Sequence, residues 1–140
     1  MLNAYTQYQN TQVISATPEK ILVMLYDGAI RFSRIALDMM DKKDMAGKGV
    51  YISKALAIVS ELMSTLNHEV GGDISRNLEQ LYVYLIGEFT EANVSNSTQS
   101  LENAINILSI LRSAWTEAIE VARKEREVGH QAESFVRAAG

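Results

Sequence analysis

Apolar residues recur every three or four positions over four stretches of the chain, the spacing of one face of an α-helix. The first two stretches predict helices over residues 18 to about 42 and 45 to about 67. The third predicts a helix over residues 73 to about 94. The fourth predicts one that begins near residue 97 and loses its apolar face after residue 123. The chain has one proline, and strong helix formers fill the four stretches, so helix is favoured throughout.

Capping residues support these bounds. Thr17 stands directly before Pro18, which suits the first turn of a helix. We expect Gly71 and Gly72 to end the second helix in a left-handed cap. Gly47 and Gly49 should fray its first turn. The expected N-caps of the four helices are Thr17, Asp44, Asp73 and either Asn96 or Ser97.

Four helices joined by short turns predict an all-α fold, an antiparallel up-down four-helix bundle. We expect the bundle to span residues 17–127, after a mobile N-terminal arm over residues 1–16 and before a mobile tail over residues 128–140. The expected core positions are Ile21, Leu25, Ala29, Phe32, Ala36, Met39, Ile52, Ala55, Val59, Leu62, Leu66, Ile74, Leu78, Leu81, Leu85, Phe89, Ala92, Ala104, Leu108, Leu111, Trp115, Ala118 and Ala122.

More positions are apolar than one core consumes. A bundle helix needs roughly three apolar positions in seven, yet residues 82–86 are all apolar or aromatic. Surplus apolar surface between helices suits an amphipathic helix of a partner. The candidate groove residues are Tyr51, Ile58, Tyr82, Ile86, Ile107 and Ile110, and Tyr5 and Tyr8 of the arm are expected to cover the groove. The alternatives are a broad edge of the core stripe and a disordered terminus.

Composition excludes several kinds of function. The net charge of −4 and scattered basic residues argue against a nucleic-acid partner. There is no cysteine, and His68 and His130 have no partners at ligand spacing, so we expect neither a metal site nor a cofactor. No catalytic constellation is evident, which argues against an enzyme. The start of the chain is unlike a secretory signal, and no apolar run reaches the ~18 residues of a membrane span, so the expected location is the cytoplasm.

Residues 17–32, TPEKILVMLYDGAIRF, closely resemble the first helix of the flagellin export chaperones of the FliS family. The similarity continues through SKALAIVSEL, LNHEVGGDISRNLEQLYVYL and ILSILRSAW, in order and with matching spacing. It covers residues 5 to about 120, and the combination of these motifs is specific. Gly87 and Glu88 depart from the pattern, because many relatives carry arginines after the tyrosine pair.

The resemblance implies a cytoplasmic export chaperone that binds the C-terminal helical segment of flagellin. Such a chaperone prevents premature polymerisation and delivers its client to the flagellar type III export apparatus, with an export gate component as a second partner. The resemblance also implies that the N-terminal arm occupies part of the binding surface in the free protein. The alternative is a bundle that self-associates as a weak homo-oligomer, or serves as an adaptor for another protein.

Overall fold

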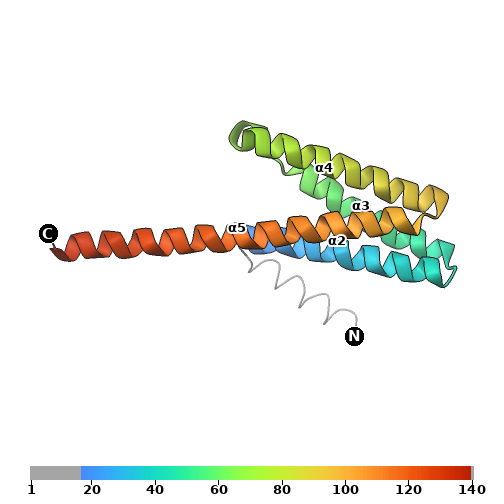
Figure 1. The fold of residues 1–140 in the computed structure, drawn as a ribbon, viewed down its shortest axis with the longest axis horizontal. Helices are drawn as coiled ribbons and strands as arrows, with labels where there is room; N and C mark the ends of the chain where they lie inside the picture. Colours follow the sequence, from blue (N-terminus) through green and yellow to red (C-terminus); the bar gives the residue numbers. More distant parts are fainter. Residues whose placement is uncertain (1–16, 140) are drawn as a thin grey trace.

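The computed structural model describes residues 17–139, so Tyr5 and Tyr8 of the predicted arm lie outside the described residues. Four helices follow one another: α2 (Pro18–Asp41), α3 (Met45–Ser64), α4 (His68–Ser95) and α5 (Thr98–Ala139). Each packs against its neighbour in sequence, and α5 also packs against α2, which closes the bundle (Figure 1). The predicted all-α up-down four-helix bundle is confirmed.

Hydrogen-bonding side chains fix where the helices begin. Thr17 Oγ1 accepts a hydrogen bond from the backbone amide three residues on, at 3.2 Å. Asp44 Oδ1 accepts one from the amide of Gly47 at 2.9 Å. Ser97 Oγ accepts one from an amide of the first turn of α5 at 3.1 Å, so Ser97 rather than Asn96 is the cap. These caps satisfy backbone donors that would otherwise lack a partner.

The turn between α3 and α4 differs from the prediction. The second helix ends before Gly71, and Asn67 rather than Asp73 caps the next one, accepting an amide hydrogen bond at 3.1 Å. Gly72 lies inside α4 with φ +51° and ψ −122°, where it interrupts the helix. A Cβ on Gly71 would lie 1.8 Å from Ser75 Oγ, which donates to the Asn67 carbonyl at 3.0 Å. The two glycines therefore permit a tight break near the start of α4.

The first turn of α3 is helical rather than frayed. A Cβ on Gly47 would lie 2.6 Å from Asp44 Oδ2 and 2.9 Å from Met39 Sδ, so this glycine lets the cap and the end of α2 meet. The next residue, Lys48, is 6 % exposed, and its Nζ donates to the Asn93 carbonyl at 3.1 Å. A buried cation thereby joins α3 to the C-terminal end of α4, the negative end of that helix dipole.

Most predicted core positions are buried. The confirmed positions are Ala29, Ala36, Ile52, Ala55, Val59, Leu62, Leu78, Leu85, Phe89, Ala92, Ala104, Leu108 and Leu111. The buried face of α2 is rotated from the expected stripe, because Tyr26, Ile30 and Met40 are in the core. Ile74 is 68 % exposed, so its placement in the core is wrong; it comes two residues after the break at Gly72. Ala118 is also exposed.

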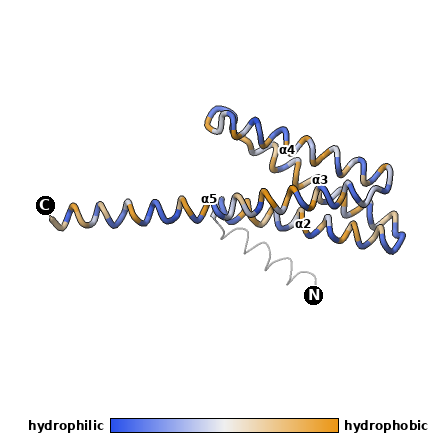
Figure 2. Tube along the Cα trace, in the orientation of Figure 1, coloured by the Kyte–Doolittle hydropathy of each residue, from blue (hydrophilic) through white to orange (hydrophobic). Residues whose placement is uncertain are grey.

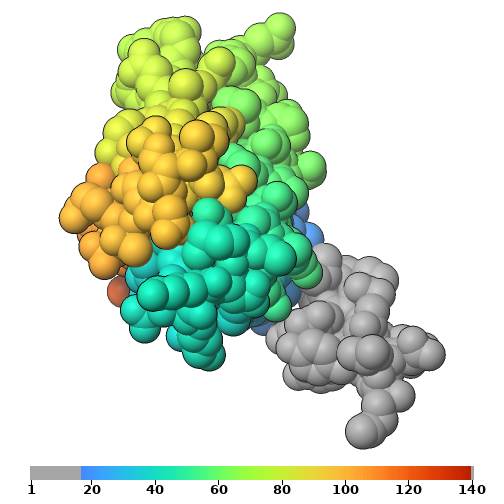
Figure 3. All heavy atoms as spheres, turned by 90° about the vertical axis from the view of Figure 1, so that its right-hand side faces the viewer, coloured from blue at the N-terminus to red at the C-terminus, as the bar shows by residue number. Residues whose placement is uncertain are grey.

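Gly28 lies where two helices approach closely. It is buried on α2, and a Cβ at this position would lie 3.2 Å from Ile58 Cδ1 of α3. Figure 3 views the bundle from the end where the α2–α3 and α4–α5 turns lie side by side. The close approach at Gly28 helps α2 and α3 to pack along their length.

The C-terminal part of α5 lies in the segment predicted to be a mobile tail. Residues 128–139 of that segment continue the helix. We call residues 123–139 the α5 extension; every one of them is exposed, and the helix runs well past the ends of the other three (Figure 1). The bundle thus carries a long projecting helix at the end where α2 begins.

Candidate functional site

A groove of about 500 Å³ lies between the start of α2 and the middle of α5, and we call it the α2–α5 groove. Val23 and Ile119 are its large aliphatic residues, and both are half-buried. Thr17, the residue that follows the undescribed residues 1–16, is also part of its lining. The complete lining is Thr17, Glu19, Lys20, Val23, Arg112, Thr116, Ile119, Glu120, Arg123 and Arg126.

Basic side chains predominate around this groove. Four cationic and two anionic residues line it, a net charge of +2. Within residues 17–139, Lys20 and Arg126 take part in no salt bridge. The groove therefore offers an apolar surface flanked by cations, which suits an apolar segment that carries carboxylates.

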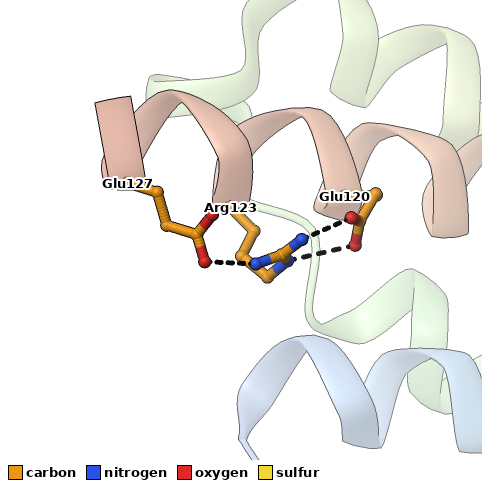
Figure 4. A network of polar contacts seen from close by, with 3 residues as sticks. All are labelled: Glu120, Arg123 and Glu127. Carbon is orange, nitrogen blue, oxygen red and sulfur yellow. Dashed lines mark hydrogen bonds and ion pairs between the residues drawn. The ribbon is translucent and has the colours of Figure 1, made fainter. Parts of the chain in front are cut away.

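The other basic residues of the groove are held by acidic neighbours. Arg123 Nη2 lies 2.6 Å from Glu120 Oε1, and Arg123 also pairs with Glu127 one turn on (Figure 4). The hydrogen bond from Arg123 lowers the pKa of the Glu120 carboxyl. Arg112 pairs with Asp27 of α2, so an ion pair joins the two helices that form the groove. These partly exposed pairs orient the side chains more than they stabilise the fold.

None of the six predicted groove residues lines the α2–α5 groove. Ile110 is 56 % exposed on α5. Four others are half-buried against the core, and one of them, Tyr51, lies 6.0 Å from the ring of Phe32, centre to centre. The half-buried residues are Tyr51, Ile58, Ile86 and Ile107. The set is distributed over α3, α4 and α5.

The prediction that Tyr82 lines a groove is wrong. It is 1 % exposed, so it belongs to the core and offers no surface to a partner. Its hydroxyl is 2.5 Å from the hydroxyl of Tyr26, which also accepts a hydrogen bond from Trp115 Nε1 at 3.2 Å. This tyrosine–tryptophan cluster joins α2, α4 and α5 through polar atoms in an apolar interior. Tyr82 can be buried because the Tyr26 hydroxyl gives its own hydroxyl a hydrogen-bond partner.

Burial also changes how the two phenols ionise. Desolvation raises the pKa of Tyr26, although its hydrogen bonds to Tyr82 and Trp115 act in the opposite direction. Desolvation raises the pKa of Tyr82 strongly, and its hydrogen bond to Tyr26 adds to the increase. Both groups therefore stay neutral in the folded protein at pH values where an exposed tyrosine loses its proton.

The stability of the fold should decrease above about pH 10, where tyrosines of an unfolded chain ionise. The raised pKa values mean that the folded state keeps protons that the unfolded state loses. This contribution is complete below the unfolded pKa and is lost as the pH rises toward the folded values. Urea unfolding between about pH 9 and 11 measures the loss. Tyr82→Phe should show a shallower decrease, and identical slopes for variant and wild type would contradict this origin.

The described residues contain no group of three or more acidic, histidine or cysteine side chains placed to hold a metal ion. His68 instead pairs with Glu79 on the same helix, with Nε2 3.0 Å from Oε2. None of the helices in residues 17–139 has both the length and the apolar composition to cross a bilayer.

Fold and groove together define a small helical-bundle protein with a surface suited to a polypeptide segment. The model of the family described as "Flagellar protein FliS" matches residues 1–122. The chain belongs to the FliS family, which consists of chaperones and not enzymes.

Curated relatives agree with this assignment. The flagellar secretion chaperone FliS of Bacillus subtilis is 35% identical over 124 residues, 89% of this chain and 92% of the relative. The flagellar secretion chaperone FliS of Vibrio cholerae is 38% identical over 115 residues, which cover 81% of this chain and 85% of the relative. A solved structure, "Crystal structure of flagellar chaperone from bacteria", has the same fold, with a TM-score of 0.69. Its sequence is 18% identical to this one, and the superposition covers 85% of this chain and 97% of the solved chain.

Val23 and Ile119 line the groove but are not among the groove residues predicted from the sequence. Val23 stands in the continuous apolar run of residues 21–26, where one stripe cannot turn every side chain inward. This run indicates that one of its side chains is available for a surface site. Ile119 follows Trp115 by one helical turn on α5, yet only the packing of α2 beside α5 brings it next to Val23.

Proposed function

We propose that this protein binds the C-terminal helical segment of flagellin in the cytoplasm, prevents its premature polymerisation and delivers it to the flagellar type III export apparatus. The α2–α5 groove, in a chain of the FliS family, is the observation that carries the proposal. Its half-buried Val23 and Ile119 offer apolar contacts that the bundle core does not use. A component of the export gate is the proposed receiving partner.

Masking is the physical basis of the proposed activity. Flagellin segments that assemble through apolar faces would associate with one another if left free. Covering about 1,000 Å² of apolar surface supplies a gross ~25 kcal/mol, and ordering a flexible segment offsets most of it. Net affinity in the micromolar to nanomolar range leaves the complex reversible, as transfer to an export apparatus requires.

The proposed contact surface extends beyond the groove. Ile110 is accessible on α5, and the half-buried residues named above offer shallower contacts on α3, α4 and α5. A client that becomes helical in pieces and wraps around the bundle would touch these separate positions in turn. Tyr82 is not among them, because it is in the core.

The N-terminal arm is the proposed cover of the groove. Residues 1–16 connect directly to Thr17, which lines the groove. The arm has no charged side chain, and Tyr5 and Tyr8 are aromatic, so it can occupy an apolar surface in the absence of a client. A client must then displace it.

Calorimetry with a peptide of the flagellin C-terminal segment tests both ideas. The full chain should bind with a Kd of micromolar or below. A chain without residues 1–12 should unfold at the same temperature and bind several-fold more tightly, because no cover has to be displaced. Absence of binding by the full chain at about 100 µM would overturn the proposed function. Equal affinities of the two chains would overturn only the cover.

A further inference from the structure

The α5 extension is an amphipathic helix whose apolar face touches no other described element. Val128 is 65 % exposed, Phe135 74 % and Val136 68 %. With 42 residues α5 is about 63 Å long, whereas the 24 residues of α2 reach about 36 Å. Water alone supports a single helix of this kind poorly, so a partner on the apolar face would supply the missing stability.

The apolar residues of the extension have the spacing of a coiled-coil seam. Val128 and Phe135, together with Val121 just before the extension, are seven residues apart. The positions four residues after these three are Glu125, Ala132 and Ala139, so the seam is apolar except at Glu125. Figure 2 shows apolar positions recurring along the projecting part of α5. Such a repeat buries its side chains between two helices rather than against a single depression.

We propose that the α5 extensions of two copies of this chain pair in antiparallel orientation and form a weak homodimer. The seam is complementary to itself. Reversing one copy about Val128 places Val121 of each chain opposite Phe135 of the other, as a two-fold axis requires. Gly129 is beside this axis and is open to solvent, and because it has no Cβ, the backbone of a second copy can approach closely there.

Charge favours a second copy over a strongly charged partner. Residues 123–139 hold four basic and three acidic side chains, a net charge of +1, so two extensions repel each other little. The match to the FliS family model ends at residue 122, just before the extension begins. A client common to the family would contact the bundle instead.

The shape of the molecule favours antiparallel pairing. In a parallel pair both bundles would lie side by side at the same end of the seam and compete for space. In an antiparallel pair they lie at opposite ends. Two helices of this length bury on the order of 1,000 Å² in total, the lower limit for a specific interface, so the dimer should dissociate at micromolar concentrations.

Sedimentation equilibrium of the full chain tests the dimer. Wild type should be largely monomeric at about 1 µM and largely dimeric at about 500 µM. Val128→Glu with Phe135→Glu should raise the Kd at least tenfold, because it places charges in the seam. Val94→Glu, at a 79 % exposed position on α4, is the matched control and should leave the Kd unchanged. A wild type that stays monomeric, or a double variant that dimerises equally well, would overturn the proposal.

Cysteine cross-linking tests the orientation, because the natural chain has no cysteine. Val128→Cys should link to itself across the two-fold axis. Phe135→Cys should link to Val121→Cys when the two are mixed, but not to itself. Efficient self-linking of Phe135→Cys would overturn the antiparallel arrangement. Dissociation of the dimer by the flagellin peptide would overturn the proposal that a second copy binds the extension, since the peptide would then bind there.

Discussion

Tyr26→Phe is expected to lower the free energy of unfolding by about 2–3 kcal/mol, and Tyr82→Phe by only about 1 kcal/mol. The Tyr26 hydroxyl is the shared atom of the cluster, since it bonds to Tyr82 and accepts from Trp115. Its removal leaves a buried phenol and an indole N–H without their partner. Removal of the Tyr82 hydroxyl leaves the bond between Trp115 and Tyr26 in place.

Urea denaturation followed by far-UV circular dichroism measures this asymmetry. Tyr84→Phe is the matched control, because Tyr84 is 46 % exposed two residues from Tyr82 and should change stability little. Equal losses for Tyr26→Phe and Tyr82→Phe would show that the hydroxyls act independently. Tyr82→Phe should also leave flagellin affinity unchanged, as expected for a residue that no partner reaches.

Val23→Asp combined with Ile119→Asp is expected to weaken binding of the flagellin C-terminal peptide at least about 100-fold, or ~2.7 kcal/mol. Both side chains are half-buried in the α2–α5 groove, and a bound apolar segment would have to desolvate the two new carboxylates. Calorimetry gives the affinity, and thermal unfolding verifies that the variant is folded.

Val83→Asp is the matched control for this experiment. Val83 is 56 % exposed on α4 and lies outside the groove, so this variant adds a charge without changing the proposed contact. Wild-type affinity in the folded double variant would place the client elsewhere on the bundle. In that case Ile107→Asp with Ile110→Asp is the next variant, because it tests the surface on α5.

The bundle could be predicted because its helices obey a simple period and begin at recognisable caps. Val59, Leu85 and Leu108 are in the core because their spacing leaves one stripe per helix to bury. On α2 the same rule was insufficient. The unbroken apolar run of residues 21–26 does not say which face turns inward, and it is the hydrogen-bond partners on α4 and α5 that make Tyr26 a core residue.

Features that depend on contacts between helices could not be predicted from spacing. The run Gly71-Gly72 predicts a helix end, although the helix that it interrupts begins at His68. The fading of the apolar seam after residue 123 predicts a bundle that ends near residue 127 and a mobile tail after it. The helix continues because no proline stops it, Gly129 costs only about 1 kcal/mol, and Arg123 pairs with residues one turn away on both sides.

The order in which the helices contact one another has a kinetic consequence. Three of the four packed pairs join helices that are adjacent in sequence, and α2 with α5 is the only packed pair that joins distant parts of the described chain. Contacts of this local kind require little loop closure, so we expect the chain to fold within microseconds to milliseconds. We expect the docking of α5 on α2, which also forms the α2–α5 groove, to be the last step, because it closes the longest loop. A newly made chain would thus acquire its groove only when synthesis has passed the middle of α5.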